Sequence, residues 1–245
     1  MLIKFFRPEH VEMFLKGNLY FKNTGYFIDL ESEHGEKGIG DKYEGSLFRH
    51  FDPNTHELHL NFGDGKKVKM NVTRAFFTER YEAARQFQLT CFTNIMEEDM
   101  ENVDEGKQKI KKELIEELKK EFPGRVPVLV TDEIEFLNRV DKTLLEKSIT
   151  ALVGNVNYFD EYEVTPLEEV KYEEDISNAF LYKRDYFKSQ REYRIVTKHP
   201  VEGDSLTVNL GDISDIVFNL ESADTLERIT VRKVEEGILL TIDNE

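Results

Sequence analysis

Residues 186–196 read YFKSQREYRIV, and the end of this stretch is rich in β-prone residues. The stretch therefore predicts a strand. Because successive side chains of a strand point to opposite faces, Gln190, Glu192 and Arg194 would share one face. An amide, a carboxylate and a guanidinium in one row indicate either a functional site or a polar face turned to water.

These two interpretations differ in what Glu192 faces. On an exposed strand, Glu192 and Arg194 would pair with charged neighbours across the sheet, and such surface pairs are frequent and contribute little to stability. A functional site instead requires Glu192 to face a cleft. The alternation pattern alone favours the exposed surface.

The composition restricts the class of partner. The chain has 245 residues, of which 39% are hydrophobic, and a formal net charge of −16. This charge disfavours general binding to nucleic-acid backbones and to anionic membranes, although it is compatible with a local basic pocket. No apolar run reaches membrane-spanning length, and the N-terminus lacks the apolar core of a signal peptide. We therefore expect a cytoplasmic protein without membrane contact.

The cysteine and histidine content predicts no metal site. Cys91 is the single cysteine, which excludes a multi-cysteine zinc site and an intrachain disulfide. It lies in an apolar, strand-like run, which predicts a buried and unreactive thiol. Two of the clustered histidines, His56 and His59, are oddly spaced for one face of a strand, so we expect surface histidines.

The order of elements predicts an α+β fold with mixed or antiparallel sheets and flanking helices. We expect a single domain over residues 1–245, with residues 94–148 as a helical insertion or flap. Expected strands cover 2–6, 19–21, 86–93, 126–130, 149–158, 192–197, 205–210, 215–218, 229–231 and 238–242. A further short element begins at residues 25–28, followed by a loop over 31–46 and a β-meander over 47–74. Expected helices cover 8–16, 110–122, 133–148, part of 166–184 and 221–227.

A glycine-rich loop at residues 38–45 is a second candidate site. Its glycines allow a ligand to approach the backbone closely. Asp41, Tyr43 and Glu44 have side chains that can hydrogen-bond ribose hydroxyls or organise a basic partner. An ordinary solvated turn is the alternative, and the sequence alone favours it.

Arg7 is a third candidate, because it lies between the end of the first strand and the start of the first helix. An arginine at this place suits an anionic ligand, since the helix amides add to its positive charge. The alternative is a surface arginine that pairs with Glu9 or Glu12.

Four pieces of the chain, taken in order, resemble a group of bacterial proteins often found near phage-defence genes. The group begins with an aromatic-Arg strand, a short helix and a G-x-L-Y-F segment. A G-D-x-x-E-G segment, a C-F-[ST] strand and a late E-x-R-[IL]-V strand follow. The counterparts here are Phe5 to Arg7 with Gly17 to Phe21, then Gly40 to Gly45, Cys91 to Thr93 and Glu192 to Val196. The resemblance spans most of the chain and implies a role in phage–host conflict.

The same layout resembles the ADP-ribosyltransferase core, which implies an NAD-using enzyme. In that superfamily a first-strand Arg or His binds NAD, and a late strand supplies a catalytic Glu, in many members with Gln or Glu two residues before it. Gln190 and Glu192 match that Q-x-E form, and Arg7 matches the first-strand position. The Ser-Thr-Ser strand of the superfamily has no clear counterpart, and residues 90–93 come nearest to it.

The resemblance implies a role for each matched residue. Glu192 would hydrogen-bond the nicotinamide ribose and stabilise the positive charge that develops as the glycosidic bond breaks. Gln190 would orient the acceptor, and Arg7 would hold the pyrophosphate or adenosine side of NAD. An aromatic side chain, that of Tyr26 or Phe27, would stack on the nicotinamide. The implied cofactor-binding residues are Arg7, Tyr26, Phe27 and Arg194.

Two other function classes fit the same sequence. A non-catalytic member of this fold would bind a basic, nucleic-acid-binding protein through its acidic segments, residues 96–105 and 160–175. A soluble structural domain would use the same charges only to stay dispersed.

Overall fold

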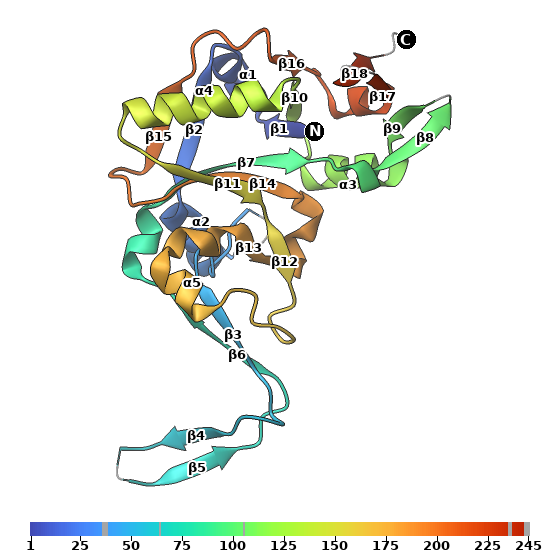
Figure 1. The fold of residues 1–245 in the computed structure, drawn as a ribbon. Helices are drawn as coiled ribbons and strands as arrows, with labels where there is room; N and C mark the ends of the chain where they lie inside the picture. The colour runs from blue at the N-terminus through green and yellow to red at the C-terminus, as the bar shows by residue number, and fades with distance from the viewer. Residues whose placement is uncertain (36–38, 64, 105, 235–236, 243–245) are drawn as a thin grey trace.

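A sheet of eight strands forms the centre of the fold (Figure 1). This computed structural model describes residues 1–35, 39–63, 65–104, 106–234 and 237–242. Every strand pair in the central sheet is antiparallel, which confirms the predicted α+β class with antiparallel sheets. The strands are β1 (Leu2–Phe6), β2 (Asn18–Asn23), β7 (Gln88–Asn94), β10 (Val126–Val130), β11 (Ala151–Asn155), β14 (Glu192–Thr197), β15 (Ser205–Asn209) and β16 (Val217–Asn219).

The strand order brings distant parts of the chain together. The main path is β11-β14-β7-β1-β10-β16, and β2 pairs with both β7 and β15. In the middle of the sheet, Ile3 of β1 lies opposite Thr93 of β7, which in turn lies opposite Glu192 of β14. The first strand and the late strand are therefore both neighbours of β7.

Two amphipathic helices cover one face of the sheet. They are α1 (Pro8–Leu15) and α4 (Glu133–Glu146), and both follow the sequence prediction closely. The side chain of Asp132 caps α4 by accepting a hydrogen bond from the backbone N–H of Glu135 at 2.9 Å. Phe14 of α1 and Phe136 of α4 pack edge to face in the core beneath these helices, with ring centroids 6.1 Å apart.

The opposite face is covered by a third helix and a smaller sheet. Helix α3 (Lys112–Glu121) buries Leu114 and Leu118 against Ile3 and Leu129 of the central sheet. The smaller sheet has the order β18-β17-β9-β8. Its strands are β8 (Met100–Asp104), β9 (Lys107–Ile110), β17 (Ile229–Val234) and β18 (Gly237–Ile242).

The segment 94–148 differs from the expected helical insertion. It contains α3 and α4 but also β8, β9 and β10. Strand β10 pairs with β1 and β16 inside the central sheet, and β9 pairs with β17. The helix predicted at 110–122 agrees with α3. Its predicted start is two residues early, because Ile110 is the last residue of strand β9.

The N-terminal third contains a helix where a short element of unassigned type and the start of a loop were predicted. Helix α2 (Thr24–His34) begins at Asn23, whose side chain accepts a hydrogen bond from the backbone N–H of Tyr26 at 3.0 Å. It ends at Gly35, which has the left-handed φ of 68° that a glycine adopts readily. The rest of the predicted loop is partly described, since residues 36–38 lie outside the described residues.

Residues 47–79 form two successive two-stranded ribbons rather than a meander. Strand β3 (Leu47–Phe51) pairs with β6 (Ala75–Glu79), and β4 (Leu58–Asn61) pairs with β5 (Lys67–Met70). The ribbons continue one another and project away from the rest of the molecule (Figure 1). Asp64 of the predicted turn lies outside the described residues.

Short strands and short helices form a layer beneath β14 and β7. The strands β12 (Asn157–Phe159) and β13 (Tyr182–Arg184) form a parallel pair. Residues 186–190 are therefore not a strand, because Asp185–Gln190 is a 3₁₀ helix that precedes β14. The short helices are α5 (Glu169–Glu174), η1 (Glu82–Gln86), η2 (Glu97–Asp99), η3 (Ile176–Leu181), η4 (Asp185–Gln190) and η5 (Ala223–Arg228).

Replacing Phe136 by alanine should destabilise the protein by about 3–5 kcal/mol, because a fully buried ring is lost from the core under α4. Urea unfolding would measure the change. Ile134→Ala on the same helix is the matched control, since Ile134 is exposed and should change stability by less than about 0.5 kcal/mol. Equal losses for the two variants would contradict the packing described for α4.

Candidate functional site

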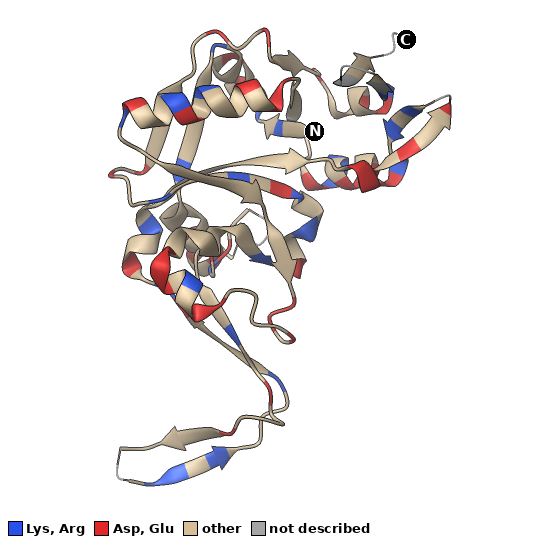
Figure 2. Cartoon of the chain, viewed as in Figure 1, with Lys and Arg blue, Asp and Glu red and all other residues tan. Residues whose placement is uncertain are grey.

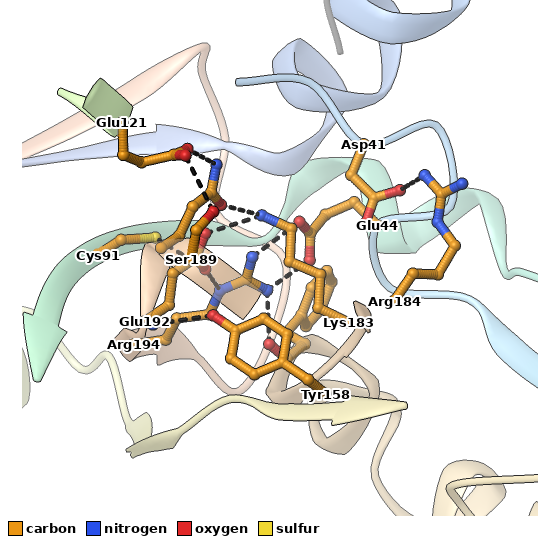
Figure 3. Close-up of polar contacts among 12 residues, drawn as sticks. Asp41, Glu44, Cys91, Glu121, Tyr158, Lys183, Arg184, Ser189, Glu192 and Arg194 are labelled. Atoms are coloured by element: carbon orange, nitrogen blue, oxygen red, sulfur yellow. Dashed lines mark hydrogen bonds and ion pairs between the residues drawn. The ribbon is translucent and has the colours of Figure 1, made fainter. Parts of the chain in front are cut away.

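Arg194 is the centre of a buried charge cluster beneath β14 (Figure 3). Its side chain is 1% exposed. Its two terminal nitrogens donate to both oxygens of Glu44, at 2.7 and 3.1 Å, and one of them also donates to the backbone carbonyl of Phe180 at 2.6 Å. Its Nε donates to Glu192 Oε2. Arg194 thus joins β14, the loop before β3 and the 3₁₀ helix η3.

Lys183 completes the cluster from β13. Its Nζ donates to Gln190 Oε1 and to Glu192 Oε1, both at 2.8 Å, and lies 4.1 Å from the ring centroid of Phe187. The three polar residues predicted to share a face, Gln190 included, therefore do converge. Sequence reasoning missed Lys183, because its partners Gln190 and Glu192 lie on other elements and no local sequence pattern predicts these contacts.

The convergence does not come from simple strand alternation. Gln190 ends η4, and Arg191 then adopts a left-handed backbone with a φ of 47° before β14 starts at Glu192. Arg191 is held there by its Nη1, which donates to Asp99 Oδ1 at 2.6 Å. The turn brings Gln190 to the same side of the sheet as Glu192.

Gly45 permits the approach of Glu44 to Arg194. Its φ is +70°, and a Cβ at this position would lie 2.5 Å from the ring of Phe180. A larger residue would push the loop away from η3. Glycine here is therefore a packing requirement of the cluster.

Residues on two neighbouring elements form the edge of the cluster. Glu121 at the end of α3 accepts from Ser189 Oγ at 2.9 Å and from Gln190 Nε2 at 3.0 Å. On β12, the hydroxyl oxygen of Tyr158 accepts from the backbone N–H of Glu192 at 2.9 Å. These contacts hold the turn before Glu192 from both sides, and neither Glu121 nor Tyr158 was identified from the sequence.

The charges of the cluster decide its protonation. Burial alone would raise the pKa of Glu192, but the charges and hydrogen bonds of Arg194 and Lys183 outweigh it and lower the pKa to about 2. Burial raises the pKa of Glu44 despite its contact with Arg194. Burial and Glu192 raise the pKa of the Cys91 thiol to about 12, which agrees with the predicted unreactive thiol, although the residue as a whole is half-buried and not buried as predicted. At neutral pH Glu192 is an anion.

The loop candidates lie beside this cluster. Arg184 donates to Asp41 Oδ1 at 2.9 Å and to Glu31 Oε2 at 3.1 Å, and its guanidinium lies 4.7 Å from the ring centroid of Tyr43. Asp41 and Glu44 are both buried. This loop is therefore a packed part of the charge cluster, and not the solvated turn that the sequence alone favoured.

Two of the predicted NAD contacts lie apart from Glu192. Arg7 is exposed, and it follows Ile3, which is level with Glu192, by four residues. At about 3.3 Å per residue this offset is roughly 13 Å along the sheet. Tyr26 is also exposed. Asn23, the N-cap of its helix, pairs with Gln88, five residues along β7 from the partner of Glu192. Phe27 is half-buried and packs against an apolar cluster that includes Phe87.

The cavities also lie elsewhere. A cavity of about 380 Å³ is lined by Tyr26 together with Lys22, Asp29 and Arg85. A second, of about 360 Å³, lies at the base of the β4–β5 ribbon. Neither is lined by Glu192, whose two oxygens are occupied by Lys183 and Arg194. NAD does not fit against Glu192 while these two contacts persist.

Comparison with known proteins provides no assignment. No family model matches the sequence, and no curated protein or solved structure matches it. Within the described ranges, no group of three or more His, Cys, Asp or Glu side chains is placed to hold a metal ion. No helix in that part of the chain is long and apolar enough to cross a membrane.

The Glu192 cluster should make stability depend on pH. Because the folded pKa of about 2 lies below the ordinary value of 4.5, the ion pairs stabilise the fold above about pH 4.5, and the contribution is lost as the pH falls towards 2. Glu192→Gln removes this titration. The stability difference between wild type and variant should therefore shrink at low pH, by up to an amount on the order of 3 kcal/mol.

Urea unfolding of both proteins from about pH 6 to about pH 3 would measure this difference. Glu163→Gln, at an exposed position, is the control and should show no such trend. A difference that stays constant over this range would mean that Glu192 is not held as a buried anion.

Proposed function

We propose that this chain is an NAD-using ADP-ribosyltransferase-like protein in which Glu192 contacts the nicotinamide ribose. The order of the strands in the central sheet is the observation that supports the proposal most. Of the four strands that bear the resembling motifs, β14, β7 and β1 are consecutive neighbours in the central sheet, and β2 pairs with β7. Gln190 and Glu192, the Q-x-E pair, lie side by side through Lys183.

The chemistry of Glu192 supports this role. Its lowered pKa keeps the carboxylate ionised, as stabilisation of a developing positive charge requires. In the structure its Oε1 accepts from the ammonium of Lys183, and a ribose hydroxyl can donate a hydrogen bond to the same oxygen. Binding of NAD at Glu192 therefore requires the side chain of Lys183 to turn away. Under this proposal the structure is a resting state in which the site is closed.

The cations of the proposed site are those of the cluster. Lys183 and Arg194 contact Glu192 directly, whereas Arg7 lies at the other end of β1. The proposal therefore assigns no NAD contact to Arg7 or Tyr26. A role in phage–host conflict remains part of the proposal through the motif resemblance, and a cytoplasmic setting remains part of it through the sequence composition.

A second candidate function is binding of a basic protein without catalysis. Acidic residues recur along the segment from the end of β12 through α5 (Figure 2), and five of them are exposed. The fully paired state of Glu192 also favours a structural role for the cluster. The exposed acidic residues of this segment are Glu163, Glu168, Glu169, Glu173 and Glu174.

The enzyme proposal predicts that wild-type protein binds NAD and releases nicotinamide. Glu192→Gln should reduce nicotinamide release by about 10²–10³-fold, because one charged group that acts in the transition state is lost. Glutamine is preferred to alanine, since its amide oxygen still accepts from Lys183 and limits the loss of stability. Calorimetry with NAD and chromatography of nicotinamide are the measurements.

Glu163→Gln serves as the control and should retain wild-type turnover. Absence of both NAD binding and nicotinamide release in the wild type would refute the enzyme proposal. If the same preparation bound a lysine-rich peptide, and salt weakened that binding, the second candidate would take its place.

A further inference from the structure

The ammonium of Lys183 is enclosed beside Glu192 (Figure 3). Its Nζ donates to Gln190 Oε1 and to Glu192 Oε1, both at 2.8 Å, and lies 4.1 Å from the ring centroid of Phe187. We call these three partners, Phe187, Gln190 and Glu192, the ammonium cage. Two oxygen acceptors and an aromatic face are the groups that recognise a primary ammonium, which has three N–H donors and no acceptor. The cage therefore has the chemistry of a cation-binding site that a side chain of the protein fills.

The acceptors of the ammonium cage are held by contacts that do not involve Lys183. Glu121 Oε1 accepts from Gln190 Nε2 at 3.0 Å, so the oxygen of the amide points to the ammonium. The reverse orientation would place the amide N–H₂ against the ammonium and the amide oxygen against a carboxylate. Arg194 Nε donates to Oε2, the other carboxylate oxygen of Glu192. Both acceptor oxygens therefore stay in place when the lysine leaves, and they then require another donor.

Lys183 is less firmly anchored than the other cation of the cluster. It lies in β13, a three-residue strand that pairs only with β12 among the described residues. Arg194 instead lies inside β14, between two neighbouring strands, and donates to three different residues. Local opening is easier in a short two-stranded pair than in a central strand. The ammonium can therefore leave the cage while the guanidinium stays.

The surroundings of the cage select a primary ammonium over other ligand groups. An anion would be repelled by the ionised Glu192 and by the adjacent carboxylate of Glu121. A neutral hydroxyl donates one hydrogen bond, whereas the cage offers two acceptor oxygens. A quaternary ammonium has no N–H to donate. A guanidinium spreads its donors over a planar fork, unlike the compact ammonium that the cage now encloses.

We propose that the ammonium cage is the acceptor subsite of this chain and takes a primary ammonium group, as on a lysine side chain, from the molecule that is modified. Lys183 is the internal occupant, and it leaves when this group enters. The assignment rests on the proposed function, because it names the acceptor of the transfer. A carboxylate oxygen accepts more than one hydrogen bond, so Glu192 Oε1 can contact both the ribose and the acceptor nitrogen.

The transfer is then a substitution at the nicotinamide ribose. The acceptor nitrogen loses one proton to water and forms a bond to the C1′ carbon of the ribose. The bond from this carbon to the nicotinamide nitrogen breaks, and its electron pair leaves with nicotinamide, which becomes neutral. Glu192 stabilises the positive charge on the ribose during the exchange. The product is a secondary ammonium that carries ADP-ribose.

Chemical rescue of Lys183→Ala tests the cage without NAD. The substitution should lower the Tm by about 6 °C or more, because a buried carboxylate loses one of its two cations. n-Propylammonium contains the side-chain atoms that the substitution removes, so it should restore most of the lost Tm in a saturable way, whereas 1-propanol should not. If the variant does not fold alone, the same comparison is made on the yield of refolded protein.

Lys198→Ala is the matched control, since Lys198 pairs with Asp175 at the surface, and n-propylammonium should leave its Tm unchanged. Equal effects of n-propylammonium and 1-propanol on Lys183→Ala, or equal effects of n-propylammonium on both variants, would overturn the proposal. Nicotinamide release by the wild type without this rescue would refute the cage alone. Rescue without nicotinamide release would refute the enzyme proposal, and the acceptor role with it, and leave a cation-binding site.

The acceptor itself is tested with wild type, NAD and Nα-acetyl-lysinamide. Mass spectrometry should show ADP-ribose on the lysine derivative and none on its Nε-acetylated form, because acetylation removes the charge. Equal modification of the two compounds, or modification of neither while nicotinamide is released, would contradict a primary ammonium as the acceptor.

Discussion

The buried guanidinium of Arg194 is the interaction on which the lower half of the molecule depends. It lies in the middle of a sheet strand, where an uncompensated charge would be strongly unfavourable. Three acceptors compensate it: the carboxylates of Glu44 and Glu192 and the carbonyl of Phe180. Each comes from a different segment, so the need to pair one charge fixes the positions of the loop before β3, of η3 and of the start of β14.

The cluster also determines what Glu192 can do. The cations that lower the pKa of Glu192 are the groups that cover it, so the same contacts prepare an anion and block access to it. A structural cluster and a closed catalytic site have the same resting geometry. They differ in whether Lys183 can be displaced by a ligand donor, and this displacement is the step that separates the enzyme proposal from the partner-binding alternative.

The sequence predicted the sheet better than the layer beneath it. The strands at 2–6, 126–130 and 192–197 and the helix over 133–148 have strong periodicity or capping residues, and the structure confirms them with small shifts at their ends. Helix α2 was missed because residues 25–28 are aromatic and β-prone, while the cap at Asn23 and the glycine at its end decide the conformation. The strands β8 and β9 were missed because their sequences, MENVD and KQKI, are mostly polar and show no clear pattern of burial.

The sequence predicted only part of the candidate site, because some of its contacts depend on turns and long-range pairs. Gln190, Glu192 and Arg194 were grouped correctly, although Gln190 reaches the group through the left-handed turn at Arg191 and not through alternation. Lys183 was not found, because a long-range ion pair between a three-residue strand and β14 leaves no local pattern. Arg7 was assigned by its position beside a helix N-terminus, and only the sheet register reveals its offset from Glu192.

A double-mutant cycle between Glu44 and Arg194 tests the central claim most directly. The cycle compares the free energies of unfolding of wild type, Glu44→Gln, Arg194→Gln and the double variant. If the pair joins the loop to β14 as described, the coupling energy should be about 2 kcal/mol or more. Losses that add within about 0.5 kcal/mol would show that the two residues act independently, and would contradict the account.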